Sequence, residues 1–233
     1  MSKRIVNLLN PKDLAELVQQ PSIKIAEFLT GFLASSMGDW KLSAGRIVQA
    51  SIKFNLLTQL GRELQEYIKK GRIKEDYYAS GKNKASLNEL LKFIDNEAPD
   101  DERFKAMKSI FFSGVSIDMD ARQEEVAYQF LLLCKKLNSI DILILGACYK
   151  IYLGDDVENV NTGINAFGDW VNTVSEKIGY GLPELISAAD PKLVELGLLS
   201  GRTYSDKSGI RTGKEFRLTT LSIKLCDFIT KYE

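Results

Sequence analysis

Apolar residues recur every three or four positions along most of this chain, and that spacing places them on one face of an α-helix. The longest periodic segment covers residues 42–70 and includes Phe54, Leu57 and Leu64. Its apolar stripe is wider than the seam of a two-stranded coiled coil, which favours a helix buried within a domain. Gly71 is predicted to end that helix because glycine adopts the left-handed C-cap conformation at low cost.

Polar residues that can accept hydrogen bonds from free backbone amides divide the rest of the chain into further helices. Ser86 and Glu89 form the sequence pattern of a capping box, in which each side chain bonds the backbone amide of the other residue. Residues 77–85, just before this pattern, are predicted to be a loop. The predicted capping residues are Asn10, Ser22, Ser86, Asp100, Asp118 or Asp120, Ser139 and Thr220.

The C-terminal third combines helices with two short strands. Its predicted elements are, in chain order, helices over 140–152 and 165–178, a helix from Pro183, a strand over 202–204, a polar tip over 205–209, a strand over 216–219 and a closing helix. The helix from Pro183 is expected to bend or restart at Asp190, because Pro191 disfavours the helical conformation in the residue before it.

This order of elements is that of a winged helix-turn-helix domain with one appended helix. The sequence therefore predicts a mainly α-helical protein with two domains. Residues 1–137 form an N-terminal helical bundle, and residues 138–233 form a winged helix-turn-helix-like domain with one β-hairpin.

The composition excludes several kinds of enzyme. The chain has no histidine, so it lacks the general base of Ser-His-Asp and Cys-His sites and the imidazole ligands of zinc or haem iron. Its three cysteines are too few for a four-thiolate zinc site. Carboxylates that could hold Mg²⁺, such as Asp118 and Asp155, lie at helix starts or in polar loops, where capping explains them. The sequence therefore predicts no catalytic residue, no metal site and no cofactor.

The apolar segments are too short to cross a membrane, which takes about 20 apolar residues. The N-terminus also lacks the cleavage pattern of a signal peptide. The cysteines are odd in number and lie in apolar helical patterns, as expected for buried, reduced thiols. We therefore expect a cytoplasmic protein that does not enter a membrane.

The neutral net charge hides two oppositely charged regions. The chain has 31 basic and 31 acidic residues, yet residues 41–84 hold ten basic against four acidic residues, and residues 154–195 hold two against eight. The candidate recognition helix, residues 183–199, has a net charge of −2 and would have to overcome repulsion before it could contact DNA bases. The opposed charges predict head-to-tail self-association or docking between the two halves of the chain.

Two groups of cations are candidate binding residues. The cations of the predicted hairpin could contact nucleic acid or an acidic partner, or they could be solvated charges that protect the sheet edge. The cations that close the long helix could bind a partner, although the helix dipole alone stabilises cations there. The candidates are Arg202, Lys207, Arg211, Lys214 and Arg217 in and just after the hairpin, Lys192 in the recognition helix, and Lys69, Lys70, Arg72 and Lys74 at the end of the long helix.

Three blocks of the chain resemble a bacterial family. Residues 33–61 hold a short glycine-containing helix and the start of the long helix, and residues 90–114 hold a leucine-rich helix, an acidic break and a helix with aromatic residues. The third block joins 137–145, 193–199 and 216–221, where LGLL is followed by RLT-x-L, a pattern shared by many bacterial winged-helix proteins. These blocks are similar to the abortive infection alpha (Abi-alpha) group of small helical phage-defence proteins. The resemblance implies a role in protection against phage and carries no catalytic residue.

We therefore hypothesise a non-enzymatic component of phage defence. It would sense or bind a protein partner, or self-associate, through its helical surfaces and its hairpin. A winged-helix DNA-binding transcriptional regulator that uses the hairpin cations is one alternative. A metal-dependent nuclease or another toxin is a second alternative.

Overall fold

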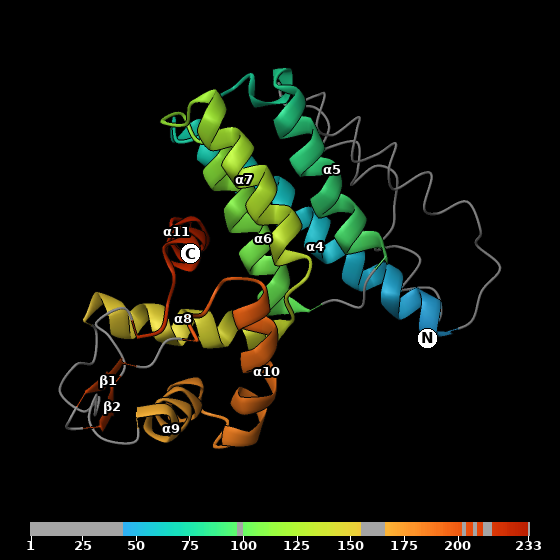
Figure 1. Cartoon of the computed structure of the whole chain (residues 1–233). Helices are drawn as coiled ribbons and strands as arrows, with labels where there is room; N and C mark the ends of the chain where they lie inside the picture. Colours follow the sequence, from blue (N-terminus) through green and yellow to red (C-terminus); the bar gives the residue numbers. More distant parts are fainter. Residues whose placement is uncertain are drawn as a thin grey trace. The chain divides into compact units, whose positions relative to one another are not determined.

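The computed structural model describes residues 44–96, 100–154, 166–201, 204–206, 209–211 and 216–232. This part of the chain is mainly helical, as the apolar spacing predicts (Figure 1). The helices expected from Asn10 and Ser22 lie outside the described residues.

The elements follow one another with short connections. In chain order they are α4 (Ala44–Lys69), the 3₁₀-helix η2 (Tyr77–Ala79), α5 (Gly81–Asn96), α6 (Asp101–Gly114), α7 (Ala121–Cys134), α8 (Ser139–Leu153), α9 (Ala166–Ile178), α10 (Pro183–Glu195), β1 (Tyr204–Asp206), β2 (Gly209–Arg211) and α11 (Thr220–Thr230).

The described residues belong to two compact units. The first unit holds α4 and the second half of α5, from Leu91, and the second unit holds the first half of α5, up to Leu90, together with α6 to α11. The boundary expected between residues 137 and 138 falls between α7 and α8, inside the second unit.

In the first unit, α4 buries Leu57, Leu60 and Leu64, which lie on the predicted apolar stripe. Gly71 follows with a φ of 65°, and its N–H donates to the carbonyl of Ile68 at 2.9 Å. The next N–H, that of Arg72, donates to the carbonyl of Tyr67 at 2.9 Å. These two bonds form a Schellman motif. The predicted end of the long helix is therefore confirmed.

The helix α5 begins earlier than the capping box predicts. It starts at Gly81, and the carbonyl of Ser80 accepts the first helical bond, from the N–H of Lys84 at 3.1 Å. Ser86 is buried inside α5, so the loop over 77–85 and the start at Ser86 are both wrong. Contacts distant in sequence fix the earlier start, because the Ser80 hydroxyl donates to Glu124 on α7 at 2.8 Å.

In the second unit, α6 is the most deeply buried helix: each residue from Ala106 to Gly114 is buried. It packs against α7, α8 and α11 (Figure 1). Its hydroxyl groups need partners in this setting. Ser109 and Ser113 both donate to the carbonyl of Phe228 on α11, at 3.1 and 2.9 Å. This shared acceptor fixes α11 along α6.

Asparagine, aspartate and threonine side chains cap α6, α7, α8 and α11 in the second unit. Asp100 caps α6 and Asp120 caps α7, so the predicted helix starts there are confirmed, with Asp120 rather than Asp118 as the cap. The caps of α8 and α11 are Asn138 and Thr219 rather than the next residues, Ser139 and Thr220. Both caps have the extended backbone that lets a side chain reach back to the N3 amide.

The helix α10 continues through Pro191, so the expected restart is wrong. A proline inside a helix removes one backbone hydrogen bond and crowds the carbonyl four residues before it, but two ion pairs on either side of Pro191 hold this part of α10. Asp190 pairs with Arg217, and Lys192 pairs with Asp141.

The two strands β1 and β2 pair antiparallel, with Tyr204 opposite Arg211. They take in parts of the predicted tip, 205–209, so the predicted strand limits are wrong. Residues 216–219 form a turn, apart from one bridge between Leu199 and Leu218. The backbone explains this difference, because Phe216 and Arg217 are left-handed, with φ of 48° and 70°.

The close approach of α6 and α7 depends on Gly114. A β-carbon added at Gly114 would lie 2.6 Å from the β-carbon of Ala127, which forces a shift of backbone. We expect Gly114→Ala to lower the free energy of unfolding by about 1–3 kcal/mol, as overpacking does. Gly146 is the matched control, because nothing lies within 4 Å of its added β-carbon. Gly146→Ala should raise stability by about 0.5–1 kcal/mol. Urea unfolding of both variants checks the pair, and equal effects would contradict the close approach.

Candidate functional site

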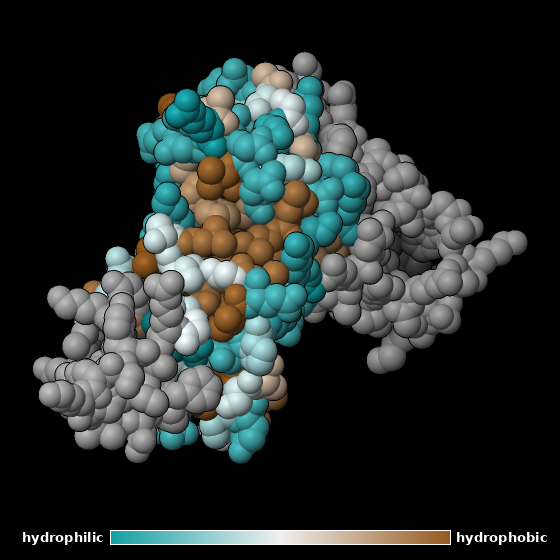
Figure 2. Space-filling view, viewed as in Figure 1, coloured by the Kyte–Doolittle hydropathy of each residue, from teal (hydrophilic) through white to brown (hydrophobic). Residues whose placement is uncertain are grey.

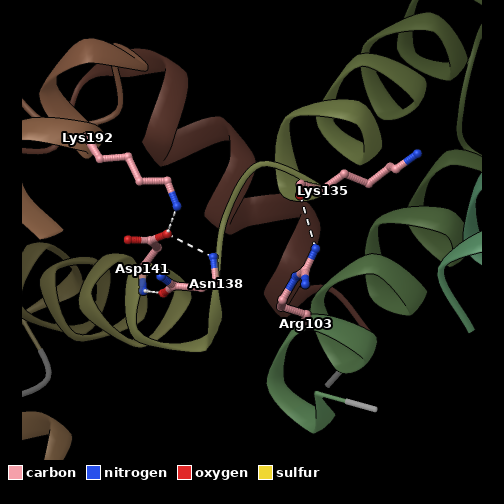
Figure 3. Close-up of polar contacts among 5 residues, drawn as sticks. All are labelled: Arg103, Lys135, Asn138, Asp141 and Lys192. Carbon is pink, nitrogen blue, oxygen red and sulfur yellow. Dashed lines mark hydrogen bonds and ion pairs between the residues drawn. The ribbon is translucent and has the colours of Figure 1, made fainter. Parts of the chain in front are cut away.

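Asp141 lies in the first turn of α8 and has no exposed surface. Reciprocal capping puts it there: the Asn138 N–H donates to its Oδ2 at 2.8 Å, and its own N–H donates to the Asn138 Oδ1 at 2.9 Å (Figure 3). The other carboxylate oxygen, Oδ1, is buried and has no hydrogen-bond partner among the described residues. A carboxylate in such a place needs a nearby cation.

Lys192 on α10 supplies that cation. Its Nζ lies 2.5 Å from the Asp141 Oδ2, and 39% of its side chain is exposed (Figure 3). The pair joins α8 to α10 and holds the ammonium group of one of the candidate binding residues inside the fold. The only signal for this pair in the sequence is a weak one, a single carboxylate within the apolar run of α8.

Arg217 is the second buried cation. Only 3% of its side chain is exposed, its Nη1 lies 2.8 Å from the Asp190 Oδ1, and its Nε donates to the carbonyl of Ser200 at 2.9 Å. Its guanidinium carbon also lies 4.4 Å from the ring centroid of Trp170 on α9. The structure therefore places this candidate binding residue in the interior, where it links α9, α10 and the segment after the strands.

Hydrogen bonds close the base of the segment that holds β1 and β2. The Ser200 N–H donates to the carbonyl of Arg217 at 2.7 Å. The Thr219 hydroxyl donates to the carbonyl of Gly197 at 2.7 Å while the same side chain caps α11. The C-terminal end of α10 and the start of α11 are thus tied together at the point where the backbone is left-handed.

The α7–α8 connection is held in a similar way. The Arg103 Nη2 donates to the carbonyl of Lys135 at 3.0 Å, just after the end of α7 (Figure 3). The Lys135 Nζ in turn lies 2.5 Å from the Glu89 Oε2 on α5. Arg103 thus bonds a carbonyl at the end of α7, and Lys135 pairs with a carboxylate of α5, so both cations have partners within the fold.

Two of the cysteine thiols are unsuited to act as nucleophiles. Burial raises the pKa of the Cys134 thiol and of the Cys148 thiol to about 12. The thiolate, rather than the thiol, is the nucleophile. Both groups therefore stay protonated at neutral pH, and all three cysteines are free and buried, as the sequence predicts.

The exposed surface of α10 is apolar and acidic. Tyr180, Leu182 and Leu185 are exposed by 49, 50 and 40%, and Glu184 in the first turn of α10 and Glu195 at its last residue are exposed too. Figure 2 shows hydrophobic and hydrophilic residues side by side around the lower end of α10. We call this region, from Tyr180 to Glu195, the α10 surface. The one cation of α10, Lys192, is bonded to Asp141.

The candidate cations at the end of α4 lie at its surface. Lys69 is exposed, and Lys70 is exposed with its Nζ 2.5 Å from the Glu66 Oε1. Arg72 lies over the Tyr67 ring, 5.0 Å from the ring centroid. Lys74 is half-buried. We call this group, Lys69 to Lys74, the α4 basic end. Among the hairpin candidates, Arg202, Lys207 and Lys214 lie outside the described residues, as does the side chain of Arg211.

Two of the carboxylates that suggested a metal site, Asp100 and Asp120, act as helix caps, whereas Asp118 is exposed in the connection before α7. Asp100 accepts hydrogen bonds from the Arg103 N–H at 3.1 Å and from the Ser139 hydroxyl. Asp120 accepts from two amides of α7. Asp155 lies outside the described residues. Among the side chains that the structure describes, no three His, Cys, Asp or Glu residues are arranged to hold a metal ion.

No family model matches this chain, and neither a curated protein nor a solved structure does. Within the described ranges, no helix is both long and apolar enough to span a membrane. The candidate functional site is therefore argued from the geometry of the α10 surface and its supporting ion pairs.

The Asp141–Lys192 pair should be required for stability. Lys192→Met keeps the side-chain stem but leaves the buried carboxylate without its cation. We expect a loss toward the lower end of the about 3–5 kcal/mol seen when one partner of a buried pair is removed, since Lys192 is partly exposed. Lys224→Met, at an exposed position of α11, should change stability by no more than about 0.5 kcal/mol. Equal urea midpoints for the two variants would show that the pair does not support the fold.

Tyr149 should contribute to the loss of stability at alkaline pH. Desolvation, together with its hydrogen bond to the Asp227 Oδ1 at 2.5 Å, raises the pKa of Tyr149 to about 12. The folded protein therefore keeps a proton that the unfolded chain releases above pH 10, and stability falls as the pH rises from about 10 toward 12. In Tyr149→Phe this contribution is absent, whereas those of the buried thiols remain. Melting temperatures measured across this range should converge for the two proteins; parallel curves would contradict the assignment.

Proposed function

We propose that this chain is a non-enzymatic binding component of bacterial phage defence and that the α10 surface contacts a protein partner. The observation that supports this most is the chemistry of α10. Its exposed residues include Leu185 and two glutamates, and its one lysine is bonded to a buried carboxylate. Partner-binding surfaces are enriched in aromatic and apolar side chains.

The order of the elements from α8 to α11 supports a winged-helix interpretation of residues 138–233. Three helices precede the paired strands, and α11 follows them. In DNA-binding members of this class, the helix at the position of α10 enters the major groove, and cations neutralise phosphates. The α10 surface has Glu184 and Glu195 at that position. The proposed module therefore uses its third helix for protein rather than for DNA.

The phage-defence part of the proposal rests on the resemblance to the Abi-alpha group. One of its blocks, residues 193–199, spans the end of α10. There the Gly197 N–H donates to the carbonyl of Val194 and the Leu198 N–H donates to the carbonyl of Leu193, a Schellman motif in which Gly197 has a φ of 70°. In this chain the residues of the block serve to end α10. That they also mark a role in phage defence is what we propose.

The test is phage protection by variants in a bacterial host. We expect cells that express the chain to show a lower efficiency of plating than cells with an empty vector. The double variant Leu182→Asp, Leu185→Asp should lose at least tenfold of that protection, because two exposed apolar contacts become charged. The matched variant Arg211→Glu, Lys214→Glu should keep it, since the proposal assigns no essential phosphate contact to the hairpin.

Two outcomes would contradict this proposal. If the purified chain binds duplex DNA with a steep salt dependence that the hairpin variant loses, the regulator alternative is correct. If induction arrests growth and Asp118→Ala relieves the arrest in a folded protein, the nuclease or toxin alternative is correct.

A further inference from the structure

The large apolar side chains of the α10 surface lie within a span of six residues, Tyr180 to Leu185. Tyr180 and Leu182 lie in the turn after α9, and Leu185 lies in the first turn of α10. The Leu185 N–H donates to the carbonyl of Leu182 at 3.1 Å, so these two residues are held in one turn. Isolated exposed apolar residues are normal, but three large ones within six residues are typical of a contact surface.

The charges around this turn are mainly negative. Glu176 at the end of α9 and Glu184 and Glu195 on α10 are exposed. Of the two cations nearby, Lys192 is bonded to Asp141, and Lys177 is exposed at the end of α9. An occupant of this surface would therefore combine apolar atoms with positive charge, which rules against a second α10 surface because two acidic rims would repel each other.

The α4 basic end has the complementary chemistry. From residue 66 to residue 74 the chain has four cations and one carboxylate, Glu66. Lys69 and Lys70 are exposed, and the half-buried side chains of Tyr67 and Ile68 lie in the same turn. A helix end of this kind offers cations, an aromatic ring and aliphatic surface together. Long lysine side chains also cover apolar surface with their stems.

We propose that the α10 surface of one copy of this chain binds the α4 basic end of a second copy. The proposal rests on the proposed function, because it takes the α10 surface to be a protein-binding surface and names the partner. Such a contact is heterologous: one copy keeps an unused α4 basic end and the other keeps an unused α10 surface, so association continues into chains or closes into a ring. Because part of the attraction is between exposed charges, salt weakens it.

Complementation between two variants tests the contact directly. Leu182→Asp, Leu185→Asp disables the α10 surface and leaves the α4 basic end intact, and Lys69→Glu, Lys70→Glu does the reverse. In sedimentation equilibrium at low salt, the unaltered chain should increase in mass with concentration, and each variant alone should stay a monomer. An equimolar mixture should form a heterodimer and stop there, because only one matching pair of surfaces remains.

The controls exclude misfolding and a general charge effect. Circular dichroism and thermal unfolding should show that both variants fold, as expected for substitutions at exposed positions. The control variant Lys136→Glu, Lys224→Glu changes the net charge by the same amount as Lys69→Glu, Lys70→Glu, but at exposed positions outside the α4 basic end. It should associate like the unaltered chain. The proposal is overturned if the unaltered chain stays a monomer at every concentration, if a single variant still associates, or if the mixture remains monomeric.

This experiment separates the self-association from the proposed function. If the chain stays a monomer but Leu182→Asp, Leu185→Asp still abolishes phage protection, the α10 surface binds another protein and the self-association is wrong. If the mixture forms the heterodimer while the variants protect cells as well as the unaltered chain does, the self-association is correct and the proposed role of the α10 surface in defence is wrong.

Discussion

The second unit depends on a buried carboxylate that must keep its cation. Asp141 has no exposed surface, and the side chain that pairs with it comes from α10, 51 residues further along the chain. An unpaired charge in that place is far more costly than the pair itself. The ion pair therefore fixes the position of α10 on α8. Because it uses the one lysine of α10, the exposed side chains that remain for a partner include apolar residues and glutamates.

The same division between internal and external charge applies to Arg217. Its guanidinium group is bonded to Asp190 and Ser200 and lies over Trp170, so it is used within the unit. Together with Lys192, it removes positive charge from the surface around α10 and leaves carboxylates and apolar side chains there. The acidic character of α10 in the sequence is thus reinforced by the fold, because Lys192 and Arg217 pair with carboxylates.

Periodicity and capping patterns predicted the helices, since both are local properties. The stripe of α4, the left-handed Gly71 and the aspartate caps of α6 and α7 all follow from residues close in sequence. The start of α5 did not, because a contact between Ser80 and Glu124 sets it. The two buried ion pairs were missed for the same reason: a sequence shows that Lys192 and Arg217 are cations but not which residue lies opposite them.

The left-handed backbone at Phe216 and Arg217 has a consistent physical explanation. Such a conformation costs about 1 kcal/mol or more for each residue other than glycine. Here it turns the Arg217 side chain toward Asp190 and Trp170 while the backbone carbonyl of the same residue accepts the Ser200 N–H. The hydrogen bonds and the ion pair offset the strain only while α10 and α11 stay in place. These interior contacts fix the connection between α10 and α11. The exposed residues of α10 can therefore change without loosening that connection. A binding role for the α10 surface can thus be tested separately from the role of α10 in the fold.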